Sequence, residues 1–182
     1  MTVMDSHANP LAENRDDPRT GGTGAGDLVR ELEVGAVAPD FTLRDQFGQD
    51  VSLSSFRGRK AVAIFFFPYA FSGVCTGEMS GIRARLDQFL TFDTEVLAIS
   101  CDPVYALRAF ADSDGLNFPL LSDFWPHGEV TQKYGVFDEK RGCPRRSSFV
   151  LDKEGLVRWS VHHANPDGRD LDAHLAELRS LA

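Results

Sequence analysis

The apolar residues of this chain fall into short runs that alternate with amphipathic stretches from residue 41 onward. The longest run, residues 61–67, has seven members and is typical of a central strand that is buried on both faces. Residues 152–155 have the composition of a tight turn, and they predict a hairpin between the strands on either side. The expected strands are residues 41–43, 51–53, 61–67, 95–100, 118–121, 147–151 and 156–161.

Apolar residues at helical spacing predict helices between and after these strands. One of them follows Asp102 and has Pro103 at its first helical position, where proline is favoured. The expected helices are one with Met79, Ile82, Leu86, Phe89 and Leu90 on a single face, one at 104–111, one near 128–134, and a last one with Leu171, Leu175, Leu178 and Leu181 as its apolar stripe.

This alternation predicts an α/β fold with a central mixed β-sheet, parallel in its middle and flanked by helices. The order of elements is compatible with a thioredoxin-like fold. Residues 1–30 contain no aromatic residue, and their glycine-rich stretch 21–26 resembles a linker, so they predict a disordered N-terminal tail. The folded domain is therefore expected to span residues 31–182.

Charge and hydropathy exclude several classes of function. The chain has 19 Lys and Arg against 27 Asp and Glu, a net charge of -8, which argues against binding to the phosphates of a nucleic acid. The run at 61–67 is far shorter than the roughly 20 apolar residues that a membrane-spanning helix needs. The first residues lack the charged and apolar regions of a secretory signal, so we expect a cytoplasmic protein.

Cys75 is the residue with the strongest chemical signal. It follows the apolar strand that stops at Pro68, and with Ser72 as N-cap it becomes the third residue of a helix. Free backbone N–H groups and the helix dipole favour a negative sulfur at that position. Because a helix end alone stabilises a thiolate only modestly, we also expect a cation, with Arg146 as the candidate and Arg145 as its alternative. On residue type alone, Cys75 could equally be a small buried apolar residue.

The spacing Pro68-x-x-x-Ser72-x-x-Cys75 resembles the Pro-x-x-x-Thr/Ser-x-x-Cys active-site signature of the peroxiredoxins. Further segments resemble the same family in order, and together they cover roughly residues 32–182. The stretch 122–128 is most similar to the one-cysteine alkyl hydroperoxide reductase E type. The matching segments are 34–43, 45–48, 51–58, 118–123, 134–136 and 146–152.

The resemblance implies a thiol-dependent peroxidase that reduces hydrogen peroxide and organic hydroperoxides. An accessible Cys75 thiolate would attack the peroxide and become a sulfenic acid. The hydroxyl of Ser72 would bind the peroxide, Arg146 would hold the thiolate and polarise the O–O bond, and Pro68 would shield the pocket from water. Glu78 matches the Cys-x-x-Glu position of the family, where it could orient Arg146 or simply lie on the helix surface.

The other two cysteines decide how Cys75 is expected to be reduced. Cys101 ends an apolar strand and is most simply a buried apolar residue. Cys143 lies in the basic stretch 141–146, whose cations could lower the pKa of its thiol, so it is a possible resolving cysteine. Otherwise the resemblance implies an external reductant, a low-molecular-weight thiol with a mycoredoxin-, glutaredoxin- or thioredoxin-like protein. Homodimers are also common in the family.

Other functions find less support in the sequence. A thiol–disulfide oxidoreductase would be expected to carry a Cys-x-x-Cys motif, whereas Cys75 is followed by Thr76, Gly77 and Glu78. A redox sensor that passes the oxidation of Cys75 to a partner stays open. We expect no metal, because adjacent His162 and His163 would point to opposite faces of a strand, and no nucleotide cofactor.

Overall fold

The computed structural model describes residues 32–163 and 168–181. The predicted tail at 1–30 lies outside the described residues. In chain order the elements are β1 (Thr42–Arg44), β2 (Asp50–Ser52), the 3-10 helix η1 (Leu53–Phe56), β3 (Ala61–Phe66), α1 (Gly73–Ala84), α2 (Leu86–Thr91), β4 (Thr94–Ser100), α3 (Val104–Asp114), β5 (Leu120–Ser122), α4 (Glu129–Lys133), β6 (Phe137–Asp138), β7 (Cys143–Pro144), β8 (Arg146–Leu151), β9 (Val157–His163) and α5 (Leu171–Leu181).

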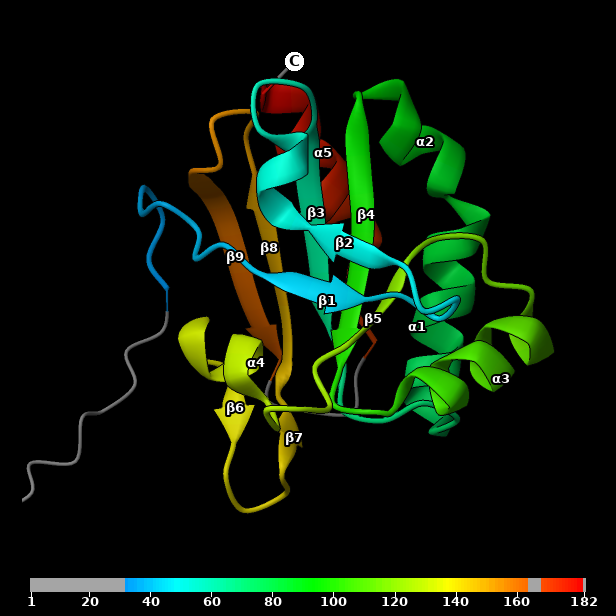
Figure 1. The fold of residues 1–182 in the computed structure, drawn as a ribbon. Helices are drawn as coiled ribbons and strands as arrows, with labels where there is room; N and C mark the ends of the chain where they lie inside the picture. Colours follow the sequence, from blue (N-terminus) through cyan, green and yellow to red (C-terminus); the bar gives the residue numbers. More distant parts are fainter. Residues whose placement is uncertain (1–31, 164–167, 182) are drawn as a thin grey trace, which may run out of the picture.

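Seven strands of the described part form one mixed sheet in the order β2-β1-β5-β4-β3-β8-β9 (Figure 1). The three central strands β5, β4 and β3 run parallel, whereas β8 pairs antiparallel with β3 and with β9. The prediction of a mixed sheet that is parallel in its middle is confirmed, as is the 147–161 hairpin. Strands β6 and β7 form a separate small hairpin that leads directly into β8.

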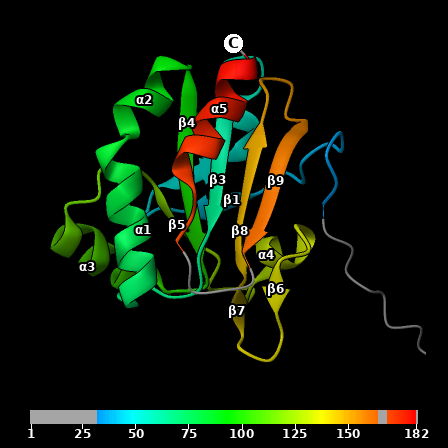
Figure 2. The same ribbon diagram turned by 180° about the vertical axis from the view of Figure 1, so that it is seen from behind.

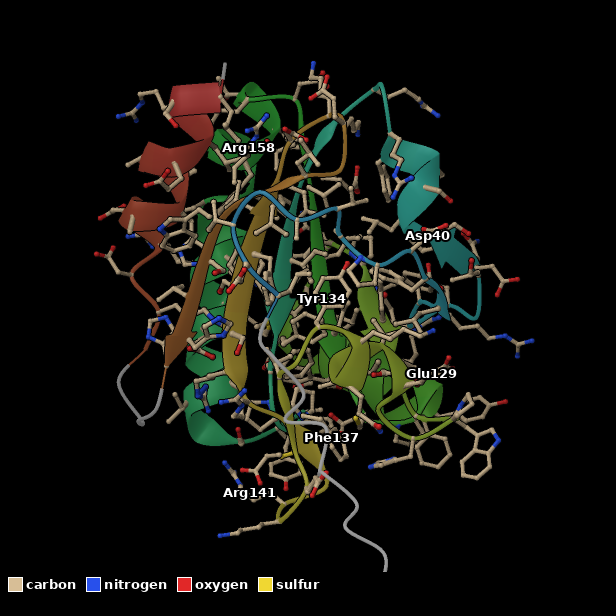
Figure 3. All side chains as sticks on the ribbon, turned by 90° about the vertical axis from the view of Figure 1, so that its left-hand side faces the viewer. Asp40, Glu129, Tyr134, Phe137, Arg141 and Arg158 are labelled. Carbon is tan, nitrogen blue, oxygen red and sulfur yellow. The ribbon has the colours of Figure 1, made fainter. Side chains whose placement is uncertain are left out.

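Alternation along β3 divides the core between the two faces of the sheet. Ala63 and Phe65 pack with α1, α2, α3 and α5 on one face, which Figure 2 shows from the helix side. Ile64 and Phe66 pack on the other face, toward α4 and the first strands. There Tyr134 points between α4 and the sheet, and its buried hydroxyl donates a hydrogen bond to the carbonyl of Pro39 (Figure 3). Every residue of β3 is therefore buried, as its continuous apolar run predicts.

The predicted helix containing residues 79–90 is wrong in one respect, because the structure has two helices there. The break falls at Arg85, whose ψ of 8° ends α1 and begins α2. The change of direction lets Phe89 reach Phe65 in an edge-to-face contact at 6.0 Å, whereas Leu90 is 51% exposed instead of buried.

Two smaller expectations about helices also need correction. The helix predicted at 104–111 begins at Val104 as expected, but Pro103 is its N-cap, with an extended ψ of 152°, and not its first helical residue; the helix also continues to Asp114. Leu181 is 38% exposed because it lies at the last turn of α5, beyond the edge of the core that Leu171, Leu175 and Leu178 fill. Within the described ranges, no helix is long and apolar enough to cross a membrane.

His174 of α5 makes the stability of this fold depend on pH. Its ring is buried between Phe65 and Trp159, and its Nδ1 lies 2.7 Å from the carbonyl oxygen of Asp170. Burial lowers the pKa of His174 from 6.5 to about 4. Between these pH values the unfolded chain binds a proton that the native chain does not. The stability contributed by neutral His174 is therefore complete above about pH 6.5 and is lost as the pH falls toward 4.

We expect His174→Phe, which keeps an aromatic ring in place, to flatten this part of the stability profile. The free energy of unfolding should fall on acidification by on the order of 2 to 3 kcal/mol less in the variant than in the wild type. Urea titrations at several pH values measure the difference. The exposed Leu90 supplies the control, because Leu90→Ser changes no titratable group and should leave the pH dependence as it is. Parallel profiles for His174→Phe and the wild type would contradict this account.

Candidate active site

Cys75 lies in the first turn of α1, where β3 passes into that helix. The N–H of Phe67 donates to the carbonyl of Ile99 at 3.0 Å. The buried Pro68, which has no backbone N–H, follows the end of the strand. Ser72 has the extended backbone of an N-cap, which makes Cys75 the third helical residue, as its sequence position predicts. The Ser72 hydroxyl makes no capping hydrogen bond to the described helix, so helix formation leaves it available for another partner.

Arg146 is the guanidinium that contacts the sulfur. Its Nη2 lies 3.4 Å from Sγ of Cys75, and its Nη1 donates to Oε2 of Glu78 at 2.6 Å. Arg145 points elsewhere and donates to the carbonyl of Gly135 at 2.6 Å. Successive side chains of an extended segment alternate between faces, so only one of the two arginines can face α1. The structure thus brings Cys75, Arg146 and Glu78 together.

A second arginine, Arg169, completes this group, although no motif or spacing in the sequence pointed to it. Its side chain is entirely buried, its backbone N–H donates to Oε1 of Glu78 at 3.2 Å, and its Nη1 lies 3.7 Å from Oε2 of the same carboxylate. The guanidinium also donates to the carbonyl of Phe66. Burial lowers the pKa of Arg169 to about 10, which leaves it charged at neutral pH. Glu78 therefore pairs with two guanidinium groups beside the thiol and orients them.

The loop between β3 and α1 is tied to the neighbouring strand by Asp102. The Asp102 carboxylate accepts hydrogen bonds from the N–H of Ala70 and the hydroxyl of Ser100, both at 2.8 Å. Phe71 adopts a positive φ of 62°, a strained conformation for a bulky residue that costs on the order of 1 to 3 kcal/mol. Its exposed ring packs against Phe110 at 5.1 Å. These ties hold the start of α1, and with it Cys75, at the end of the central strands.

Cys75 itself is less exposed than its expected reactivity suggests. Its exposed fraction is 0%, because the thiol is part of the core that α1 forms with β3, so the expectation of an accessible cysteine is wrong for this conformation.

Cys143 and Cys101 are also buried free thiols. The expectation that nearby cations lower the pKa of Cys143 is wrong, because burial raises it and this effect outweighs the opposing effects of Tyr69 and Arg141. Arg141 lies at the tip of the β6–β7 hairpin (Figure 3). Its carbonyl accepts a hydrogen bond from the hydroxyl of Tyr69. Burial raises the pKa of Cys101 to about 12, which agrees with its prediction as an inert apolar residue.

The group as a whole is arranged to stabilise a negative sulfur and to direct hydrogen bonds at an incoming oxygen. It combines a helix start, a guanidinium in contact with the thiol and a serine hydroxyl that is not used by the helix. Among the described residues, no cluster of three or more His, Cys, Asp or Glu side chains is placed to hold a metal ion. The helix start and the guanidinium at the sulfur support the chemistry of a thiolate nucleophile.

Comparison with known proteins agrees with this geometry. The AhpC/TSA family model matches residues 34–160. The chain is a peroxiredoxin of that family. It is 50% identical over 139 residues to alkyl hydroperoxide reductase E of Mycobacterium tuberculosis, which covers 76% of this chain and 91% of the relative. Among solved structures, it is similar to the peroxidoxin BcpB of Mycobacterium tuberculosis, with a TM-score of 0.77 and 30% identity over 84% of this chain and 99% of the other.

A second solved structure gives the same result. Enterococcus faecalis AhpC superposes with a TM-score of 0.74 at 27% identity, covering 81% of this chain and 90% of that one. The thioredoxin-like fold of the peroxiredoxins is thereby confirmed, and so is the resemblance to the alkyl hydroperoxide reductase E type. This peroxiredoxin is a thiol-dependent peroxidase.

Proposed function

We propose that this peroxiredoxin reduces hydrogen peroxide and organic hydroperoxides by a one-cysteine mechanism centred on Cys75. The observation that carries the proposal is the 3.4 Å contact between the Arg146 guanidinium and the Cys75 sulfur at the start of α1. The thiolate attacks one peroxide oxygen, an S–O bond forms, and the O–O bond breaks. Cysteine loses two electrons and becomes a sulfenic acid, while the leaving oxygen takes a proton and departs as water or an alcohol.

The neighbouring side chains have distinct roles in this proposal. Arg146 holds the thiolate and donates to the peroxide as the O–O bond lengthens, which stabilises the charge on the leaving oxygen. The Ser72 hydroxyl donates to or accepts from the bound peroxide, a role that serine shares with the more common threonine. Pro68, buried at the end of β3, keeps water from the sulfur. Glu78 fixes the direction of the Arg146 guanidinium.

The reductant in this proposal is an external thiol. Cys143 and Cys101 are both buried and both have raised pKa values, which leaves neither with appreciable thiolate at neutral pH. A low-molecular-weight thiol would condense with the sulfenic acid, releasing water and forming a mixed disulfide. A mycoredoxin-, glutaredoxin- or thioredoxin-like protein would then reduce that disulfide and return Cys75 to the thiol.

Intact-mass measurement after one equivalent of hydrogen peroxide, with dimedone present, tests the proposal. A dimedone adduct mapped to Cys75 is the expected result, because dimedone traps sulfenic acids. A loss of two hydrogens with Cys75 joined to Cys143 would replace the one-cysteine mechanism by a two-cysteine mechanism. An unmodified Cys75 would refute both. Turnover that requires added thiol distinguishes the enzyme from a sensor that is oxidised once.

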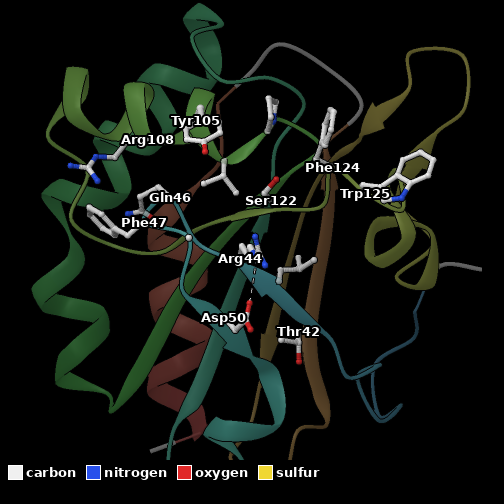
Figure 4. Close-up of a pocket in the computed structure, with 14 residues that line it drawn as sticks. Thr42, Arg44, Gln46, Phe47, Asp50, Tyr105, Arg108, Ser122, Phe124 and Trp125 are labelled. Atoms are coloured by element: carbon white, nitrogen blue, oxygen red, sulfur yellow. Dashed lines mark ion pairs between the residues drawn. The ribbon is translucent and has the colours of Figure 1, made fainter.

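We also propose that the protein forms a homodimer through an aromatic face built around β1 and the start of α3. Tyr105 and Trp125 are 88% and 83% exposed, and with Phe47 and Phe124 they surround a hollow of about 870 Å³ (Figure 4). Exposed aromatic clusters of this kind are typical of protein interfaces.

A second copy fits this aromatic face because the face carries charges of both signs. Arg44 and Asp50 lie 3.7 Å apart and both are largely exposed (Figure 4). Two copies related by a two-fold axis can therefore pair Arg44 of each with Asp50 of the other, as an isologous interface requires.

Light scattering of the eluting protein tests the homodimer. The wild type is expected at twice the chain mass, and the double variant Tyr105→Ser, Trp125→Ser at the chain mass. Leu90→Ser, which changes an exposed apolar residue on α2, should remain dimeric. A monomeric wild type, or a dimer that survives the double variant, would show that this face is not the interface.

A further inference from the structure

His163, the last residue of β9, lies next to the site that contains Cys75. It is the register partner of Arg146 on the antiparallel strand β8. Cross-strand partners project from the same face of a sheet, so His163 lies on the face that α1 and α5 cover. His162 projects from the opposite face, where its Nδ1 lies 3.0 Å from the Ser147 hydroxyl and its ring contacts Phe149. The two adjacent histidines therefore have different surroundings.

The groups that face His163 come from every element packed against it. They are Arg146 on β8, Glu78 on α1, Arg169 before α5 and His174 on α5. His162, on the opposite face, acts on His163 only through its charge. Glu78 is the carboxylate of this set, and it already accepts hydrogen bonds from Arg146 and from the backbone of Arg169. A proton on His163 would thus add a third cation to a group that has one carboxylate for two guanidinium groups.

No hydrogen bond among the described residues holds Nε2 of His163 in one protonation state. Its Nε2 is buried and has no hydrogen-bond partner among the described residues, and the same holds for Nε of Arg169. Buried polar atoms without partners are uncommon, and they mark a place where a change of charge or a bound water alters the arrangement. Burial, reinforced by Arg169, lowers the pKa of His163. His163 is therefore neutral when the Arg146–Glu78 pair has the geometry described here.

We propose that His163 is a positioning residue that makes the hold of Arg146 on the Cys75 sulfur depend on pH. When His163 is neutral, Glu78 interacts only with Arg146 and Arg169 among these groups, and the Arg146 guanidinium stays in contact with the thiolate. Protonated His163 repels Arg146 and Arg169 and attracts Glu78, so the Arg146–Glu78 pair loosens and the guanidinium moves from the sulfur. The residue acts through Arg146 and Glu78, and it takes no part in bond making.

This inference rests on the proposed reaction of Cys75 with peroxide. The direction of the pH effect on the oxidation rate follows from the positive charge that a proton adds to His163. As the pH falls below the ordinary pKa of histidine, near 6.5, protonation of His163 slows the oxidation of Cys75. Two losses of rate are then separable: the loss that His163 causes, and any loss that comes from other groups. A variant without this histidine should retain the loss from other groups and lack the loss from His163.

Stopped-flow oxidation of Cys75 by hydrogen peroxide, from about pH 8 to about pH 5, separates the two losses. The measured quantity is the wild-type rate divided by the rate of His163→Gln at each pH. We expect this ratio to fall about threefold to tenfold across the range, the size of a like-charge contact at a partly screened site. His162→Gln is the matched control, because that side chain lies on the other face, and its ratio should stay constant.

The outcomes separate this inference from the proposed function. A ratio that does not change with pH, or one that falls equally for both variants, would overturn the role of His163 while leaving the peroxidase intact. No oxidation of wild-type Cys75 at any pH would instead refute the proposed function. Circular dichroism at each pH verifies folding, and His163→Asn repeats the test if the glutamine variant does not fold.

Discussion

Replacing Cys75 with serine is expected to reduce peroxide turnover by roughly 10³-fold or more, the scale on which enzymes lose activity with their nucleophile. The serine oxygen is not ionised near neutral pH and is a poor nucleophile toward a peroxide oxygen, so the helix start and Arg146 would have no anion to stabilise. The substitution is small and falls in the first turn of α1, where serine is compatible with the helix. Loss of activity with normal folding would therefore locate the chemistry at this sulfur.

Cys143→Ser is the matched control, since Cys143 is also a fully buried free thiol close to an arginine. In the one-cysteine mechanism this variant should keep the wild-type rate of peroxide consumption with an external thiol. Turnover that persists in Cys75→Ser would refute the assignment of the nucleophile. A Cys143→Ser enzyme that reacts once with peroxide and then stops would show instead that Cys143 resolves the sulfenic acid.

The central part of the fold could be predicted from the sequence because its signals are local. The continuous apolar run of β3 directly indicates a strand that is buried on both faces. The turn at residues 152–155 likewise indicates the hairpin of β8 and β9. The position of Cys75 at a helix start is likewise a matter of a few neighbouring residues. The break at Arg85 is different, because it depends on the contact of Phe89 with a distant strand.

The residues around the site that the sequence analysis did not identify also depend on contacts between distant parts of the chain. Arg169 follows an unremarkable polar stretch in the sequence, and its burial arises only when the segment before α5 crosses the end of β3 and meets Glu78. Asp102 reaches the active-site loop because β4 lies beside β3. His163 is opposite Arg146 only through the register of β8 and β9. Such residues have no spacing signature, since the fold brings together positions that are far apart in the chain.

Arg146→Ala is expected to slow the oxidation of Cys75 by about 10²- to 10³-fold, the cost of removing a charged donor from a developing anion. The variant loses the 3.4 Å contact with the sulfur, so the sulfur and the leaving oxygen both lack this hydrogen-bond donor. Stopped-flow oxidation by hydrogen peroxide measures the rate. The rate of iodoacetamide alkylation of Cys75, which should also fall, is a second measure of the reactivity of the sulfur.

Arg145→Ala provides the control at the adjacent position. Arg145 carries the same charge one residue away, but its guanidinium donates to the Gly135 carbonyl and faces away from α1. Removing it should change the oxidation rate by no more than about twofold, because a charge at the surface is strongly screened. Equal loss in both variants would mean that the general positive charge of this segment stabilises the thiolate. A loss confined to Arg146→Ala would mean that stabilisation depends on one guanidinium, held by Glu78 against one sulfur.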